Sequence, residues 1–134
     1  MSALSTYLEN KLVDHVLRNT AYTTPGTTIY VGLIKFYDSP VVEAGTLTQE
    51  ASGGAYARIQ VTAWDAASDG ATQNTGAITF PTATADWGMI SGVIISDAST
   101  AGNVLLHGSL TTARDVKDGD VFKFNAGDLD VTFA

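Results

Sequence analysis

The chain has 134 residues, which is enough for one domain with its own hydrophobic core. It contains no cysteine, and this excludes a disulfide framework and a thiolate metal site. Its 14 acidic and 7 basic residues give a formal net charge of −7, so we expect it to bind neither nucleic acid nor an anionic membrane.

The N-terminal segment, residues 4–19, predicts one amphipathic helix. Apolar side chains recur there at helical spacing, and most charged residues lie on the other face. Thr6 and Glu9 have the spacing of a capping box, and Pro25 prevents the helix from continuing further. We therefore divide the chain into a helix with its connector, residues 1–24, and a β-domain, residues 25–134.

The apolar stripe of this helix needs a cover, because an isolated helix of this length is only marginally stable in water. Two surfaces could bury it: the β-domain of the same chain, or a neighbouring subunit. In the second case the stripe is a partner-binding surface. Its candidate residues are Leu4, Leu8, Leu12 and Val16.

The rest of the chain predicts strands separated by turns rich in Gly, Asp and Ser. A spacing of about ten residues between strands is typical of a sandwich or barrel. We predict a mainly β fold, an antiparallel β-sandwich of jelly-roll or immunoglobulin-like type with one N-terminal helix. The predicted strands are residues 28–37, 56–64, 76–80, 87–96, 103–110, 120–124 and 128–133.

Two of these strands carry further information. In residues 56–64, Ile59 and Val61 alternate with Arg58 and Gln60, which places Arg58 on the polar face. Residues 87–96 contain Gly88 and Gly92, which indicates a bulge or a close approach of another segment to the backbone.

The last two strands are joined by Asn-Ala-Gly-Asp, residues 125–128, and this predicts a hairpin. Leu129, Val131 and Phe133 of the final strand are predicted to point inward. Residues 38–54 are the least regular part of the chain. We interpret them as a surface excursion with room for a short edge strand.

No pattern in the sequence predicts an enzyme. His15 follows Asp14 on the helix, where adjacent side chains point in different directions, and His107 lies in a predicted strand. The chain has no nucleophile-elbow pattern and no phosphate-binding glycine loop. We therefore expect no catalytic residue and no cofactor.

Three clusters of aspartate beside glycine are candidate calcium-binding sites. None of them has the alternating ligands and closing glutamate of an EF-hand loop. Aspartate and glycine are also what tight turns require. We favour turn chemistry and no metal site at residues 65–70, 117–120 and 127–130.

The two tryptophans, Trp64 and Trp87, lie at strand ends beside aspartates. Their rings could stack on a sugar, so both are candidate glycan contacts. An aromatic residue at a strand end more often covers the core, and we favour that interpretation.

The order of several segments resembles a family of small bacteriophage virion proteins of the tail fibre type. The resemblance covers nearly the whole chain except residues 35–49. It is carried by LSTYLENKLVDHVLRNTAY, YVGL, GGAYARIQVT, ITFPTATADWGMISGVIISDA, GNVLLHGSL and DGDVFKFNAGDLDVTF.

The resemblance implies a structural, non-enzymatic protein of the phage particle, associated with the tail or tail fibre. Its expected partners are other virion proteins, with many copies or a homo-oligomer in each particle. Because no signal peptide or membrane span is predicted, we expect synthesis and assembly in the host cytoplasm. Two alternatives remain open: a decoration protein that bridges major capsid subunits, and a carbohydrate-binding adhesin.

Overall fold

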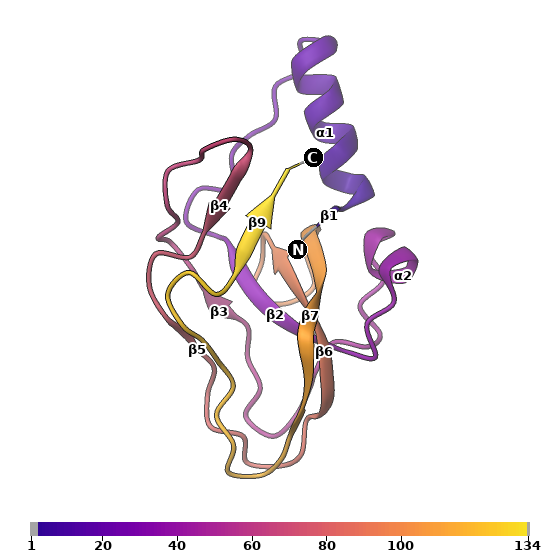
Figure 1. The fold of residues 1–134 in the computed structure, drawn as a ribbon. Coiled ribbons are helices and arrows are strands. Elements are labelled where there is room, and N and C mark those ends of the chain that lie inside the picture. Colours follow the sequence, from indigo (N-terminus) through magenta and orange to yellow (C-terminus); the bar gives the residue numbers. More distant parts are fainter. Residues whose placement is uncertain (1–2, 134) are drawn as a thin grey trace.

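A computed structural model describes residues 3–133, and its centre is a five-stranded antiparallel sheet (Figure 1). The strands lie in the order β1-β7-β6-β2-β3, and every neighbouring pair is antiparallel. They are β1 (Ala3–Leu4), β2 (Tyr30–Lys35), β3 (Ile59–Gln60), β6 (Gly88–Ser96) and β7 (Val104–Val116).

Two short ladders lie against one face of this sheet. In the first, β4 (Ala71–Gln73) pairs with β9 (Asp130–Thr132), and in the second β5 (Ile78–Thr79) pairs with β8 (Lys123–Phe124). Side chains of both ladders share one hydrophobic core with β2, β6 and β7. The mainly β, antiparallel fold is therefore confirmed, with an opposing layer made of two separate ladders.

A short helix, α2 (Ser39–Glu43), covers the other face of the sheet. It packs through Val42, which contacts a second and smaller core formed with Ile34, Ile94 and Val104. Since β6 and β7 are covered on both faces here, their apolar residues run continuously instead of alternating. The predicted surface excursion of residues 38–54 therefore contains a helix that was not predicted.

The N-terminal helix, α1 (Thr6–Leu17), begins one residue earlier than a capping box at Thr6 would place it. Ser5 is the N-cap, and its hydroxyl accepts a hydrogen bond from the N–H of Leu8 at 3.2 Å. The same hydroxyl donates to the carbonyl of Val104, and the N–H of Ser5 donates to the carbonyl of Leu105 at 2.8 Å. The prediction for Thr6 was therefore wrong, because Ser5 is fixed in place by β7.

The predicted hairpin between the last two strands is also wrong, although its turn is present. The N–H of Asp128 donates to the carbonyl of Asn125 at 3.0 Å. Asn74 lies between the two strands, where its amide donates to the carbonyl of Asn125 and its side-chain oxygen accepts from the N–H of Leu129. Because Asn74 occupies the groups that a hairpin would pair, β8 and β9 separate and join different partners.

The close approach expected at Gly92 is confirmed. A Cβ atom at this position would lie 2.4 Å from Cδ1 and 2.7 Å from Cβ of Tyr37. The register between β6 and β7 also shifts between Ile90 and Gly92. Gly92 therefore lets Tyr37 lie directly on the backbone of β6.

A candidate assembly surface on the N-terminal helix

The first half of α1 packs against its own domain. Leu8 is 4% exposed and belongs to the main core, and Leu12 is half-buried against it. Leu4 lies in β1, outside the helix, where it pairs with Leu106. Three of the four candidate residues of the stripe, Leu4, Leu8 and Leu12, thus contact the domain itself.

The second half of α1 extends beyond the sheet and carries apolar side chains in solvent (Figure 1). Val13 is 52% exposed, Val16 72% and Leu17 78%. Positions separated by three and four residues share one side of a helix, so these three side chains form a continuous surface. We call it the helix patch; it contains Val16 of the predicted stripe.

An apolar groove lies beside this helix, with a volume of about 260 Å³. One wall is Leu8 and Leu12 of α1, and the floor is formed by apolar residues of β6, β7 and β9. Almost every side chain that lines it is apolar or aromatic. The floor residues are Ile95, Leu105, Leu106 and Val131, and the other lining residues are Tyr22, Pro25, Ile29, Trp64, Thr72 and Phe133.

The two tryptophans have different environments. Trp87 is 2% exposed, donates from Nε1 to the carbonyl of Gly54 at 2.8 Å, and packs edge-on against Tyr56. A ring without an exposed face cannot stack on a sugar, so its placement contradicts a glycan contact at Trp87. Trp64 is half-buried in the wall of the apolar groove.

The prediction that Leu129, Val131 and Phe133 point inward is confirmed only in part. Leu129 and Val131 are buried in the main core as expected. Phe133 is 45% exposed at the edge of the groove, because the ladder of β4 and β9 ends at Thr132. Exposed apolar side chains therefore occur at the groove edge as well as in the helix patch.

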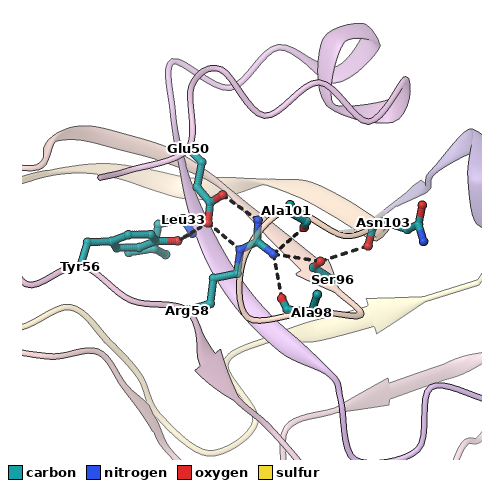
Figure 2. Close-up of polar contacts among 8 residues, drawn as sticks. All are labelled: Leu33, Glu50, Tyr56, Arg58, Ser96, Ala98, Ala101 and Asn103. Carbon is teal, nitrogen blue, oxygen red and sulfur yellow. Dashed lines mark hydrogen bonds and ion pairs between the residues drawn. The ribbon is translucent and has the colours of Figure 1, made fainter. Parts of the chain in front are cut away.

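Arg58 is the most deeply buried charged residue of the described chain, 7% exposed, although strand alternation predicted it on the polar face. Its Nε and Nη2 donate to the two carboxylate oxygens of Glu50, both at 2.7 Å (Figure 2). Its Nη1 donates to the hydroxyl of Ser96 and to the carbonyls of Ala98 and Ala101. The guanidinium thereby fastens the turn between β6 and β7 to the segment after α2.

Tyr56 completes this network. Its hydroxyl donates to Glu50 at 2.8 Å and accepts a hydrogen bond from the N–H of Leu33 at 2.9 Å. Burial and the neighbouring Glu50 carboxylate raise the pKa of Tyr56, and the hydrogen bond to Glu50 raises the pKa of Arg58. The charges of the pair are satisfied by each other, so the network is a structural clamp.

The two histidines have different environments. His15 is exposed, and its Nδ1 accepts the N–H of Tyr22 at 3.1 Å. His107 is 1% exposed, with Nδ1 2.6 Å from the hydroxyl of Tyr37. Its Nε2 makes no hydrogen bond within residues 3–133 and lies 3.9 Å from a carboxylate oxygen of Glu43. Neither histidine contacts a serine and an aspartate in a catalytic arrangement.

We expect the protein to lose stability as the pH falls below about 6.5, the ordinary pKa of histidine. Burial lowers the pKa of His107 in the fold, against a smaller opposing effect of Glu43. In the window below 6.5 the unfolded chain therefore binds a proton that the folded chain does not, and this favours unfolding by up to about 1.4 kcal/mol for each pH unit. Urea unfolding at several pH values measures the slope, and the variant His107→Gln should flatten it; an unchanged slope contradicts the prediction.

The aspartates beside glycine serve as turn residues. The carboxylate of Asp120 accepts the N–H of Lys117 at 2.9 Å, and that of Asp128 accepts the N–H of Asn125 at 3.0 Å. Asp65 accepts from the side chains of Gln73 and Thr75, and these bonds lower its pKa. Within residues 3–133 there is no cluster of three or more potential metal ligands.

Within the same part of the chain, neither helix has the length and hydrophobicity that a membrane crossing requires. The charged and polar groups of the interior are thus paired in structural roles, apart from Nε2 of His107. The exposed apolar features of the described residues include the helix patch and the apolar groove, which are surfaces suited to contact with another protein.

Comparison with known proteins identifies the family. A family described as podophage GP4 fiber I protein gp80 matches residues 3–132, almost the entire chain. No curated protein matches the sequence. The match agrees with the resemblance to phage tail fibre proteins and extends through residues 35–49. The chain therefore belongs to the podophage GP4 fiber I protein gp80 family, and it is a tail-fibre-associated structural protein of a phage virion.

Proposed function

We propose that this protein is a non-enzymatic accessory subunit on the exterior of the particle, at the tail or tail fibre, and that the helix patch makes its contact with another virion protein. The observation that carries the proposal is the exposure of Val13, Val16 and Leu17 on the part of α1 that extends beyond the sheet. Three neighbouring apolar side chains in solvent favour a protein interface.

The charged groups of the fold support the same interpretation. The buried charges, Arg58 and its partner Glu50, are paired within the described residues. The exposed carboxylates of Asp120 and Asp128 close turns. A catalytic site needs groups that are free to act on a substrate, and these groups are already committed to the fold.

The variant Leu17→Asp is expected to reduce incorporation into particles while the isolated protein keeps its fold. Leu17 is 78% exposed, so the cost to stability is no more than about 1 kcal/mol, from helix propensity and the charge near the helix C-terminus. Mass spectrometry of purified particles measures the copies of each variant per particle. Circular dichroism of the isolated variant checks that it keeps its fold.

Val121→Asp is the matched control, because Val121 is also an exposed aliphatic residue, 52% accessible, but lies away from α1 in the loop before β8. We expect normal incorporation of this control. Normal incorporation of Leu17→Asp contradicts the proposal. The number of copies in wild-type particles tests the location, because hundreds of copies would place the protein on the capsid as a decoration protein and not on the tail.

A further inference from the structure

The sequence contains two Asp-Gly dipeptides, Asp69-Gly70 and Asp118-Gly119, and all four residues lie exposed in turns. Aspartate is especially prone to isomerise when glycine follows it, because no side chain hinders attack by the glycine nitrogen on the aspartate carboxyl group. The residue after the aspartate is the same in both dipeptides. A difference in their reactivity must therefore come from the fold.

The turn at Asp69-Gly70 directly precedes β4. Ser68 and Ala71 exchange two backbone hydrogen bonds, both of 3.0 Å, and enclose the dipeptide as a two-residue turn. The N–H of Gly70 makes no hydrogen bond within residues 3–133, and neither does the carboxylate of Asp69. The nitrogen that attacks and the carboxyl group that it attacks are thus both uncommitted in the fold.

The turn at Asp118-Gly119 differs at the reacting nitrogen. The N–H of Gly119 donates to the carbonyl of Ala83 at 2.7 Å. The N–H of Asp118 donates to the carboxylate of Asp86 at 3.0 Å. Because the first of these bonds must break before the Gly119 nitrogen can attack, the fold protects this dipeptide.

The backbone of Asp69 adds a reason for it to react. Its φ is +54°, in the left-handed region, where Cβ of an L-residue lies close to the following carbonyl oxygen. In isoaspartate the chain runs through Cβ and Cγ, so this crowding is released. Asp118 is not among the residues with positive φ.

We propose that Asp69 is a site of spontaneous isomerisation to isoaspartate, independently of the proposed function. The nitrogen of Gly70 attacks Cγ of the Asp69 carboxylic acid, and one carboxyl oxygen leaves as water with the acid proton and the amide proton. Water then opens the resulting cyclic imide. Cleavage between the nitrogen and Cγ restores aspartate, whereas cleavage between the nitrogen and the backbone carbonyl carbon gives isoaspartate. No oxidant or other reactant is consumed.

Isoaspartate at residue 69 lengthens the turn by one backbone atom. The carbonyl of Gly70 accepts the N–H of Phe133 at 2.8 Å, and β4 begins at the next residue. A longer turn displaces this carbonyl and weakens the ladder of β4 and β9, which contributes Thr72 and Val131 to the apolar groove. We therefore expect ageing of the protein to loosen one wall of the groove.

Prolonged incubation of the full chain near neutral pH tests the proposal. Isoaspartyl methyltransferase with labelled S-adenosylmethionine measures total isoaspartate, and electron-transfer dissociation of proteolytic peptides locates it. We expect at least about fivefold more at residue 69 than at residue 118, the effect of one net hydrogen bond. Asp69→Glu should abolish the signal at residue 69, because glutamate must close a larger ring, and should leave residue 118 unchanged.

The same incubation in concentrated guanidinium chloride is the control for the role of the fold. Both dipeptides then lack their native contacts, so their rates should become nearly equal. The proposal is overturned if the folded protein forms as much isoaspartate at residue 118 as at residue 69, or if unfolding leaves the ratio unchanged. Hydrogen exchange of the isolated isoaspartate form tests the consequence: the N–H of Phe133 should exchange faster, and an unchanged rate contradicts the loosening of the groove.

Discussion

Replacing Arg58 with alanine is expected to lower the free energy of unfolding by about 3–5 kcal/mol. The guanidinium is the donor in five hydrogen bonds, two of them to Glu50. Its removal leaves the Glu50 carboxylate, 15% exposed, without its opposite charge and leaves the carbonyls of Ala98 and Ala101 without a donor. Chemical denaturation at neutral pH, with circular dichroism as the signal, measures the change.

Arg18→Ala is the matched control, because Arg18 also forms an ion pair with a carboxylate, that of Asp14. That pair, with Asp14 at 3.2 Å, is exposed on the helix, so its loss should cost at most about 1 kcal/mol. The double variant Arg58→Met with Glu50→Gln removes both charges and should be more stable than Arg58→Ala. Equal effects of Arg58→Ala and Arg18→Ala would show that the buried clamp contributes no more than a surface pair.

Gly92→Ala is expected to cost about 3 kcal/mol, at the upper end for an over-packed core. The new Cβ would lie 2.4 Å from Cδ1 and 2.7 Å from Cβ of Tyr37, distances at which the ring and the backbone of its loop must move. Gly92 is not among the glycines with positive φ, so the cost is steric and does not arise from the backbone conformation of alanine. The midpoint of urea unfolding measures it.

Gly76→Ala serves as the control, because no heavy atom lies within 4 Å of a Cβ built there and its φ is not positive. We expect almost no change in stability. A second test combines Gly92→Ala with Tyr37→Ala. Since Tyr37→Ala removes the ring contact at 2.4 Å and keeps only the contact with Cβ, the double variant should cost less than the sum of the two single variants. Additive costs would mean that Tyr37 is not the source of the strain.

The parts of the fold that the sequence predicted are those with strong local signals. The apolar and β-branched residues of β2 and β6 specify strands wherever they pair, and Gly92 predicted a close approach because no other residue leaves the backbone so accessible. The sequence of α2 also carries a local signal, because Asp38 precedes a proline in the first turn, the usual arrangement at a helix start.

The errors have a different origin, because they depend on contacts distant in sequence. Arg58 alternates with apolar residues like any solvent-facing strand residue, and only Glu50 from an irregular segment makes its burial possible. The turn at residues 125–128 formed as predicted, but Asn74 from fifty residues earlier changed the pairing of the strands that it joins. A local sequence pattern contains no information about partners that are distant in the sequence.

The candidate site shows the same limit. Periodicity predicted that α1 is amphipathic, and it included Val16 of the helix patch. It did not separate the residues that contact the domain, Leu8 and Leu12, from those that remain exposed, because the helix leaves the sheet partway along its length. The apolar groove has lining residues from six separate segments of the sequence and has no local signal.

The anchoring of Ser5 on β7 has a consequence for biogenesis. Its hydroxyl binds the carbonyl of Val104, 99 residues later in the chain, and its N–H binds that of Leu105. The ribosome releases α1 long before β7 exists, so the helix cannot take its final orientation until translation has passed the strand that holds it. Prematurely terminated polypeptides that lack β7 would therefore not hold α1 in its native orientation.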